Sequence, residues 1–171
     1  ANLSDSVDFN SKDILLGGNQ NYKATVTYIV SIVNQQYLQQ EILKPLMLNI
    51  KFTSPEDTKE NIKQLVQQLP LPIGQTSFIG SLNEAIGEIL EGKVVLFINH
   101  FDQAFVLDIK ELASRSVETP QIESATRGPQ EAFTENSKTN IGLIRRRIKS
   151  SNLKIISYTK GLYSKTKISV F

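Results

Sequence analysis

The feature that most constrains the fold is a run of apolar residues, Val94-Val-Leu-Phe-Ile98, which is followed by a polar turn and a second apolar run. A strand with one face in water alternates apolar and polar residues, whereas this run does not alternate, so we expect both of its faces to be buried. Residues 99–102 turn the chain, and residues 104–108 return as the partner strand. The sequence therefore predicts a buried β-hairpin within an α/β domain.

Two further strands are predicted near the start of the chain. Residues 7–16 end in an apolar run, and residues 23–33 are rich in β-branched and aromatic side chains that alternate at first. Glycine and asparagine residues separate the two runs, and these residue types favour tight turns. We expect the two strands to pair as a hairpin.

Three helices are predicted between the two hairpins. Asn34 can cap the first helix, and Lys44-Pro45 is expected to end it, because the residue before a proline disfavours helical geometry. Residues 54–69 carry an apolar stripe at helical spacing. A capping box with Ser81 as N-cap begins the third helix, and Gly92 is placed to end it.

The second half of the sequence predicts a linker, a helix and a hairpin. Residues 113–130 contain Ser, Thr, Pro and Gly without periodicity and are typical of a linker. A helix is expected from about 134 to 150, followed by strands over 153–159 and 165–171. One face of this helix is expected to carry the apolar residues Phe133, Ile141, Ile144 and Ile148.

The last hairpin resembles the first in sequence. Ile14-Leu-Leu, a polar turn and Tyr22-Lys-Ala-Thr-Val-Thr-Tyr correspond to Ile155-Ile-Ser, a turn and Ser164-Lys-Thr-Lys-Ile-Ser-Val. In the first copy the hairpin leads into a helix, and the second copy stops there. A repeat of this kind indicates two related subdomains, the second either cut short or completed by strands of the first. Chance similarity between two hairpins is the alternative.

These observations predict an α/β fold made of two small α/β subdomains with mixed β-sheets flanked by helices. The first subdomain spans residues 1–112, the linker spans 113–130, and the second subdomain, which looks incomplete, spans 131–171. A cleft between two such lobes is a natural place for a small ligand, and closure about the linker would be the signal.

The sign of the charge changes along the chain. Residues 1–112 carry 8 Lys and 13 Asp and Glu, a net charge of −5, whereas residues 113–171 carry 11 Lys and Arg and 4 Glu, a net charge of +7. Such asymmetry indicates two bodies with different partners or two halves that attract each other, and two solvated polar surfaces are the plainer alternative.

The most conspicuous local feature is Arg145-Arg-Arg147. On a helix these three residues spread over about 200°, so they cannot form one patch. We expect Arg146 to point away from the apolar face and Arg145 to lie beside Lys138 and Lys149. The stripe could contact another subunit, the acidic first half or anionic headgroups. The alternative is a solvated face whose cations lie near the helix C-terminus.

Two further positions are candidates for contacts. Arg127, fixed by the following Gly-Pro, could hold a carboxylate through two hydrogen bonds, either Glu131 or one in the first subdomain. Arg127 could therefore serve either as a structural clamp at a hinge or as a contact to a ligand. Asn140 is a poor helix former and could bond to the neighbouring loop or face solvent.

No catalytic, metal or cofactor site is predicted. The sequence has no cysteine and one histidine, His100, so thiolate zinc sites and clusters of histidine ligands are excluded within it. The glycines match neither phosphate-loop pattern, and no serine lies in a nucleophile elbow. Nucleic acid is not expected as a partner, because the cations are not interleaved with aromatic residues.

The segment from Arg127-Gly-Pro to Arg145-Arg-Arg-Ile-Lys149 resembles the characteristic stretch of GerA-type spore germination receptor A subunits. Further pieces match in order and spacing: Glu41-Ile-Leu-Lys-Pro-Leu-Met47, Leu90-Glu-Gly-Lys-Val-Val-Leu96, Ser114-Arg-Ser-Val-Glu118 and Ser164-Lys-Thr-Lys167. The resemblance covers roughly residues 23–171.

The resemblance implies a non-enzymatic, soluble domain of a protein of the inner spore membrane, facing the spore core and anchored through a C-terminal region. It implies a role in sensing or transmitting nutrient binding to trigger germination, and the alternative is a scaffold that only assembles subunits. The implied partners are the receptor's B and C subunits, other A subunits and a small nutrient germinant.

Overall fold

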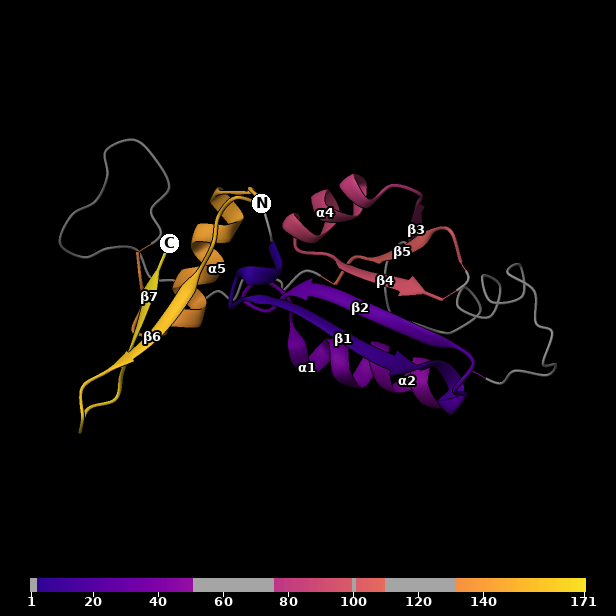
Figure 1. The fold of residues 1–171 in the computed structure, drawn as a ribbon, viewed down its shortest axis with the longest axis horizontal. Coiled ribbons are helices and arrows are strands. Elements are labelled where there is room, and N and C mark those ends of the chain that lie inside the picture. Colours follow the sequence, from indigo (N-terminus) through magenta and orange to yellow (C-terminus); the bar gives the residue numbers. More distant parts are fainter. Residues whose placement is uncertain (1–2, 51–75, 100, 110–131) are drawn as a thin grey trace.

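The computed structural model describes residues 3–50, 76–99, 101–109 and 132–171. They form a five-stranded sheet with the strand order β1-β2-β4-β5-β3 and a separate two-stranded hairpin (Figure 1). Helices accompany both, so the α/β fold class is confirmed. The predicted helix 54–69, the linker 113–130, His100, Arg127 and Glu131 lie outside the described residues.

Two hairpins build most of the large sheet. Its strands are β1 (Phe9–Leu15), β2 (Lys23–Ile29), β3 (Thr76–Ile79), β4 (Val94–Ile98) and β5 (Ala104–Leu107). All of their described pairs are antiparallel, and so is the pair in the small sheet. The parallel pairs that a mixed sheet needs are therefore not found among them. For β1–β2 and β4–β5, which are joined by short connections, the reason is that such strands can only pair antiparallel.

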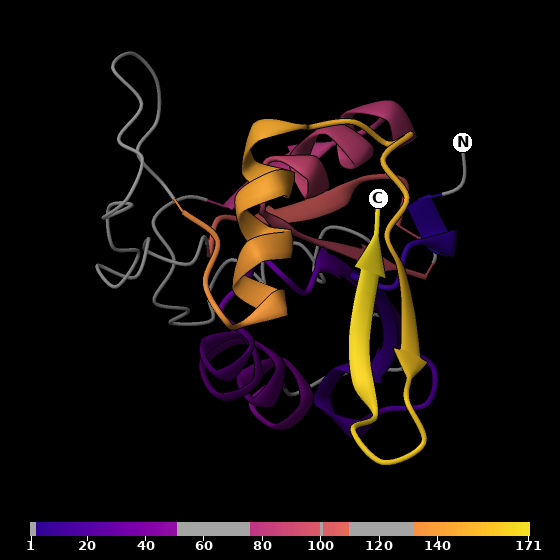
Figure 2. The same ribbon diagram turned by 90° about the vertical axis from the view of Figure 1, so that its left-hand side faces the viewer.

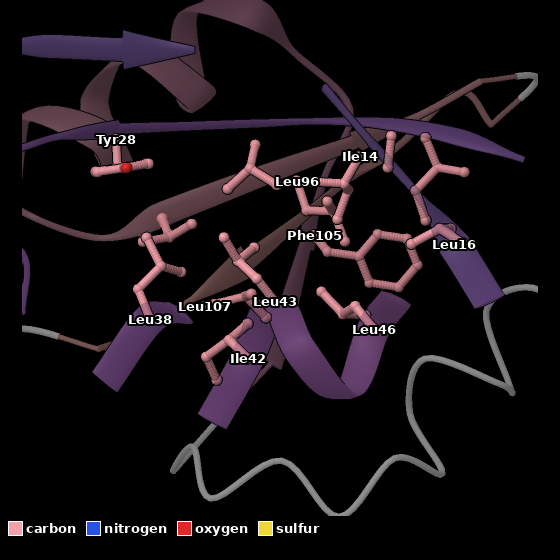
Figure 3. Close-up of a cluster of buried hydrophobic side chains, with 14 of the residues drawn as sticks. Ile14, Leu16, Tyr28, Leu38, Ile42, Leu43, Leu46, Leu96, Phe105 and Leu107 are labelled. Carbon is pink, nitrogen blue, oxygen red and sulfur yellow. The ribbon is translucent and has the colours of Figure 1, made fainter. Parts of the chain in front are cut away.

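The central strand β4 is buried on both faces, as the sequence predicts. Val94 and Leu96 belong to the apolar cluster on one face, and Val95 belongs to the cluster on the other face. The first face is covered by the helical segment 35–48, and the second by α4 (Leu82–Leu90). Figure 3 shows side chains of the segment directed at Leu96 and Phe105.

The helical segment 35–48 does not end at Lys44-Pro45, so that prediction is wrong. The segment consists of α1 (Gln35–Tyr37), the π-helical turn η3 (Leu38–Leu43) and α2 (Lys44–Leu48). Pro45 lacks an N–H and crowds the preceding turn of an α-helix. The wider π turn before Pro45 changes the hydrogen bonding there. The Lys44 N–H donates to the Gln39 carbonyl, five residues earlier instead of four. Burial of Leu46 against the sheet stabilises the helix beyond Pro45.

The remaining predicted helix signals are found in α4. The Ser81 side chain accepts a hydrogen bond from the backbone N–H of Asn83, which confirms the N-cap. Gly92 follows the helix with φ of 89°, a left-handed conformation that favours glycine. Short 3₁₀ turns, η1 (Leu3–Asp5) and η2 (Leu16–Gly18), flank β1.

The second half of the chain forms α5 (Ser137–Arg147) and the hairpin β6 (Ile156–Lys160) and β7 (Thr166–Val170). The helix is shorter than predicted, because Asn136 caps its first turn and Ile148 has already left helical geometry. Phe133 and Ile148, expected on the apolar face, lie outside the helix and are exposed. Seen end-on in Figure 2, α5 and the hairpin lie at one end of the large sheet. No helix of the described residues is long and apolar enough to cross a membrane.

Candidate functional site

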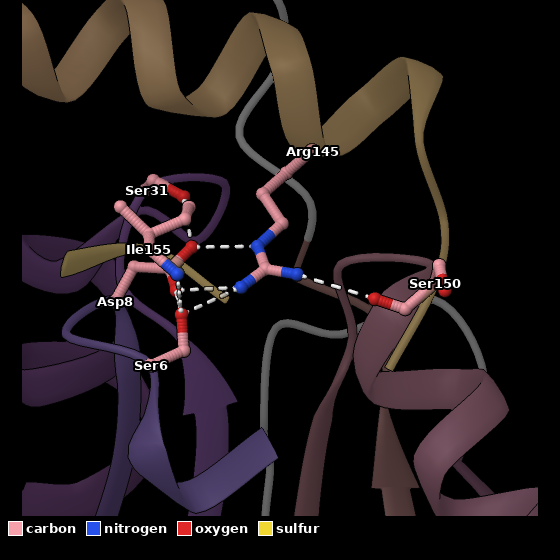
Figure 4. Close-up of polar contacts among 6 residues, drawn as sticks. All are labelled: Ser6, Asp8, Ser31, Arg145, Ser150 and Ile155. Atoms are coloured by element: carbon pink, nitrogen blue, oxygen red, sulfur yellow. Dashed lines mark hydrogen bonds and ion pairs between the residues drawn. The ribbon is translucent and has the colours of Figure 1, made fainter. Parts of the chain in front are cut away.

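The most unusual side chain of the described residues is Arg145, which is 1% exposed. It extends from the last turn of α5 to the residues just before β1 (Figure 4). Its Nε donates to Asp8 Oδ2 over 2.8 Å, and its Nη2 donates to Asp8 Oδ1 over 2.9 Å. This is a bidentate pair, the strongest arrangement available to an arginine and a carboxylate.

Neighbouring groups complete the hydrogen bonding of this buried pair. Ser6 accepts from Arg145 Nη2 at 2.8 Å and donates to Asp8 Oδ1 at 2.7 Å. Ser31 donates to Asp8 Oδ2 at 3.2 Å, and Arg145 Nη1 donates to the Ser150 carbonyl at 3.4 Å. Both carboxylate oxygens and three guanidinium nitrogens therefore have partners, as burial of two charges requires.

The backbone before β6 is tied to the same point. The Ile155 N–H donates to Ser6 Oγ at 2.9 Å, and the Val7 N–H donates to the Ile155 carbonyl at 2.9 Å. Ile155 itself is fully buried. Helix α5 and the start of the β6–β7 hairpin are thus both fixed to the first few residues of the chain. We call the group Ser6, Asp8, Ser31, Arg145 and Ile155 the arginine clamp.

The clamp keeps its carboxylate ionised. Burial by itself raises the pKa of Asp8, but hydrogen bonds from Arg145 and Ser6 and the positive charge of Arg145 outweigh it, so the pKa lies below its usual value. Asp8 is therefore negative at neutral pH, and the clamp is an ion pair rather than a neutral hydrogen bond.

One turn before Arg145, the backbone of α5 itself touches the first half of the chain. A Cβ atom on Gly142 would lie 2.5 Å from the carbonyl oxygen of Ser31, closer than real Cβ contacts allow. Glycine therefore permits an approach that any other residue would prevent. Gly142 and Arg145 are three positions apart and share one helix face, so the close approach and the clamp act together.

Two exposed ion pairs are formed by lysines that lie between Arg145 and Ile155 in the sequence. Lys149 Nζ lies 2.8 Å from Glu91 Oε2, and Lys154 Nζ lies 3.4 Å from Asp5 Oδ2. In each pair, as in the clamp, the base comes from the positive half of the chain and the acid from the negative half. The charge asymmetry thus corresponds, at these three points of the described structure, to two halves that attract each other.

Only part of the predicted contact stripe is exposed. Lys138 and Arg146 face solvent, whereas Arg145 is buried, so Lys138, Arg145 and Lys149 do not form one exposed stripe. Arg145 and Lys149 instead contact the acidic first half, at Asp8 and Glu91, which is one of the contacts predicted for this stripe. Helical spacing orders residues around the axis but does not say how far the neighbouring part of the protein extends over that face.

Asn140 bonds to the preceding loop, which is one of its two predicted roles. Its Nδ2 donates to the Thr134 carbonyl at 2.7 Å, and its Oδ1 accepts from the Thr134 N–H at 2.7 Å. The Asn140 side chain therefore fixes the backbone of the loop that leads into α5.

An open groove of about 160 Å³ lies between α5 and β7. Its lining is mainly apolar: Phe133, Ser137, Asn140, Ile141, Ile144, Ser169 and Phe171. The Asn140 amide already bonds to Thr134, so Ser137 and Ser169 are its remaining polar side chains. The groove suits a small apolar group better than a charged one.

The comparisons with known proteins agree on one family. The sequence profile described as Bacillus/Clostridium GerA spore germination protein matches residues 1–171, the whole chain. The chain belongs to this family. Membership confirms the relationship that the motifs around Arg127–Lys149 indicate in the sequence.

Relatives of this GerA-family chain are longer proteins. Spore germination protein KA of Bacillus subtilis is 27% identical over 168 residues, which are 98% of this chain and 30% of that protein. The uncharacterized membrane protein YfkQ of Bacillus subtilis is 33% identical over 143 residues, 84% of this chain and 27% of that protein. The chain thus spans less than a third of the length of these two relatives.

A solved structure shares the fold of this GerA-family chain. The N-terminal domain of the A subunit of the Bacillus megaterium spore germinant receptor GerK3 superposes with a TM-score of 0.69 at 22% identity. The match covers 98% of this chain and 58% of that chain.

The acidic partner of the clamp is the residue that sequence reasoning missed. Asp8 lies in a segment that reads only as a strand, and it is 137 positions from Arg145. The sequence signal that was available is the excess of acid in the first half and of base in the second, which predicts attraction but not the pair. Ser6 and Ser31 carry no signal of their own.

Proposed function

We propose that this GerA-family chain senses or transmits germinant binding in a membrane-bound germinant receptor, and that movement of one part of the domain against the other carries the signal. The moving part is α5 with the β6–β7 hairpin, and the arginine clamp is the joint through which its displacement reaches the large sheet. The receptor's B and C subunits, the inner spore membrane and a position on the core side belong to the same proposal. No enzymatic step is part of it.

The observation that carries the proposal is the bidentate pair between Arg145 and Asp8. A buried ion pair gives little net stability, because the desolvation of two charges roughly cancels their attraction. It does impose geometry, because only one orientation of the guanidinium satisfies both carboxylate oxygens. The clamp thus fixes the direction of α5 relative to β1 more than it stabilises the fold.

A conservative substitution in the full-length subunit tests this role. Arg145→Lys keeps the charge but loses the second hydrogen bond to Asp8. If the clamp contributes about 1.4 kcal/mol to the coupling between the two parts of the domain, spores that carry this variant should germinate at least about tenfold more slowly. Germination after nutrient addition is measured as the fall in optical density. Arg146→Lys, at the neighbouring exposed position, should germinate normally.

Subunit abundance in the same spores separates the outcomes. Slow germination with normal abundance of all receptor subunits supports transmission through the clamp. Normal germination of the Arg145→Lys spores at normal abundance contradicts it.

The second candidate function is a scaffold that assembles receptor subunits without a ligand. The exposed cation Lys138 favours it, because an exposed charge can pair with a partner without disturbing the fold. Lys138→Glu should then remove the other subunits from the spore membrane while the subunit itself persists. Unchanged receptor assembly would leave the transmission proposal as the better account.

A further inference from the structure

The β6–β7 hairpin has one apolar face that nothing in the described residues covers. Ile156 pairs with Val170 and Tyr158 pairs with Ile168, so these four side chains lie on the same face of the two-stranded sheet. They are 38% to 48% exposed. We call this set Ile156, Tyr158, Ile168 and Val170 the hairpin face.

The other face of the hairpin is polar and is the one turned to α5. Ser157 pairs with Ser169 and Thr159 pairs with Lys167 there, and Ser169 lines the groove against α5. Since side chains alternate along a strand, the hairpin face is directed away from α5. The arrangement is the reverse of an ordinary two-layer packing, in which the apolar side of a sheet meets its helix.

The first hairpin shows what covers such a face in this protein. In the sequence similarity between the two hairpins, Val26 corresponds to Ile168 and Tyr28 to Val170. Val26 and Tyr28 are 1% and 4% exposed, because their face packs against the helical segment 35–48 (Figure 3). The same two positions of the second hairpin are 44% and 47% exposed. A helix-covered face and its uncovered counterpart thus occur in one chain.

The charge around the hairpin face indicates which kind of segment can cover it. Residues 150–171 contain four lysines and no acidic residue. Lys160 pairs with Thr166 and therefore lies on the apolar side, at the end next to the turn. An apolar stripe bordered by acidic side chains complements this surface, whereas a basic stripe is repelled by it.

We propose that the hairpin face is the docking surface for an amphipathic helix of the same receptor subunit, which takes the position that segment 35–48 has on the first hairpin. Its apolar stripe covers Tyr158 and Ile168, and its acidic border lies near Lys160. The proposal does not depend on signal transmission through the clamp.

The relatives are long enough to supply such a helix from the same subunit. The chain matches only 58% of the GerK3 N-terminal domain and 30% of germination protein KA. Relatives therefore carry substantial polypeptide outside the matched region, some of it within the same N-terminal domain. A two-stranded hairpin by itself is only marginally stable, so a helix packed on it would stabilise it. A helix in the same polypeptide has a high effective concentration at this face and therefore binds it without a separate partner.

Accessibility of single cysteines in the full-length subunit tests the proposal. Residues 1–171 contain no cysteine, so Tyr158→Cys and Ile168→Cys report on the hairpin face, in a background where cysteines elsewhere in the subunit are replaced. Thr159→Cys on the polar face, also exposed in this structure, is the matched control. In the subunit expressed alone, both face cysteines should react with a polar maleimide at least about tenfold more slowly than the control. Lys160→Glu should reduce that difference, and Lys160→Arg should retain it.

Each other result overturns the proposal. Equal reaction rates at all three positions mean that the face is open. Protection that disappears on dilution of the subunit indicates a second copy as the occupant. Protection that requires coexpression of the other receptor subunits indicates one of them instead.

Discussion

Replacing the two charges of the arginine clamp separately and together tests whether it fixes geometry or supplies stability. Arg145→Met removes the guanidinium and leaves Asp8 buried and without its ion-pair partner. Asp8→Leu leaves the guanidinium buried without its carboxylate. The double variant replaces the whole pair by apolar side chains.

The magnitudes follow from burial of both partners, whose side chains are 1% and 4% exposed. Removing one partner of such a pair costs about 3–5 kcal/mol, because an uncompensated charge stays in the interior. Replacing both removes that penalty, so the double variant should be at least about 2 kcal/mol less destabilised than the sum of the single variants. Lys154→Met removes the half-exposed ion pair with Asp5 and should lower the free energy of unfolding by only about 0–1 kcal/mol.

Urea unfolding followed by circular dichroism measures these differences. With a slope of about 2 kcal/mol per molar urea, each single variant should lower the midpoint by about 2 M. A shift below about 0.5 M for Arg145→Met, or single costs that simply add in the double variant, would refute the reasoning.

Two further predictions concern pH and the close approach of α5. Since the pKa of Asp8 is lowered in the folded protein, its contribution to stability should be complete above the unfolded pKa of about 4 and lost as the pH falls through the folded value. In Arg145→Met burial should instead raise that pKa, so acidification from pH 7 to about 5 should stabilise the variant, and urea midpoints that fall over this range would contradict the ion pair. Gly142→Ala should destabilise by about 1–3 kcal/mol, because its Cβ would meet the Ser31 carbonyl. Gly87→Ala, in open space on α4, should stabilise by about 0.5–1 kcal/mol, and equal thermal midpoints for the two variants would show that the α5 contact is unimportant.

Much of the local structure could be predicted from the sequence because its signals are local. The unbroken apolar run 94–98 required burial on both faces, and β4 has it. Ser81 and Gly92 marked the ends of α4, because capping depends on neighbouring residues only. Pro45 misled for the same reason: its local preference ends a helix, but burial of Leu46 under the sheet outweighed that preference.

The candidate site could not be predicted in the same way. Helical spacing predicted that Arg146 points away from the apolar face, but it did not predict that Arg145 is buried. Which of them turns inward depends on a carboxylate that the fold brings from the other end of the chain, and no periodicity encodes such a contact. Lys149 and Glu91 illustrate the same point at the surface.

The sequence by itself determined the family, the hairpins and the opposite charges of the two halves, because these follow from motifs, side-chain alternation and composition. Only the tertiary structure decided that the halves meet through Arg145 and Asp8 and that Gly142 lets α5 approach Ser31. The physical reason is that a charge is tolerated in the interior only where a partner and its hydrogen bonds are already in place, and residues 137 positions apart acquire that relationship only by folding.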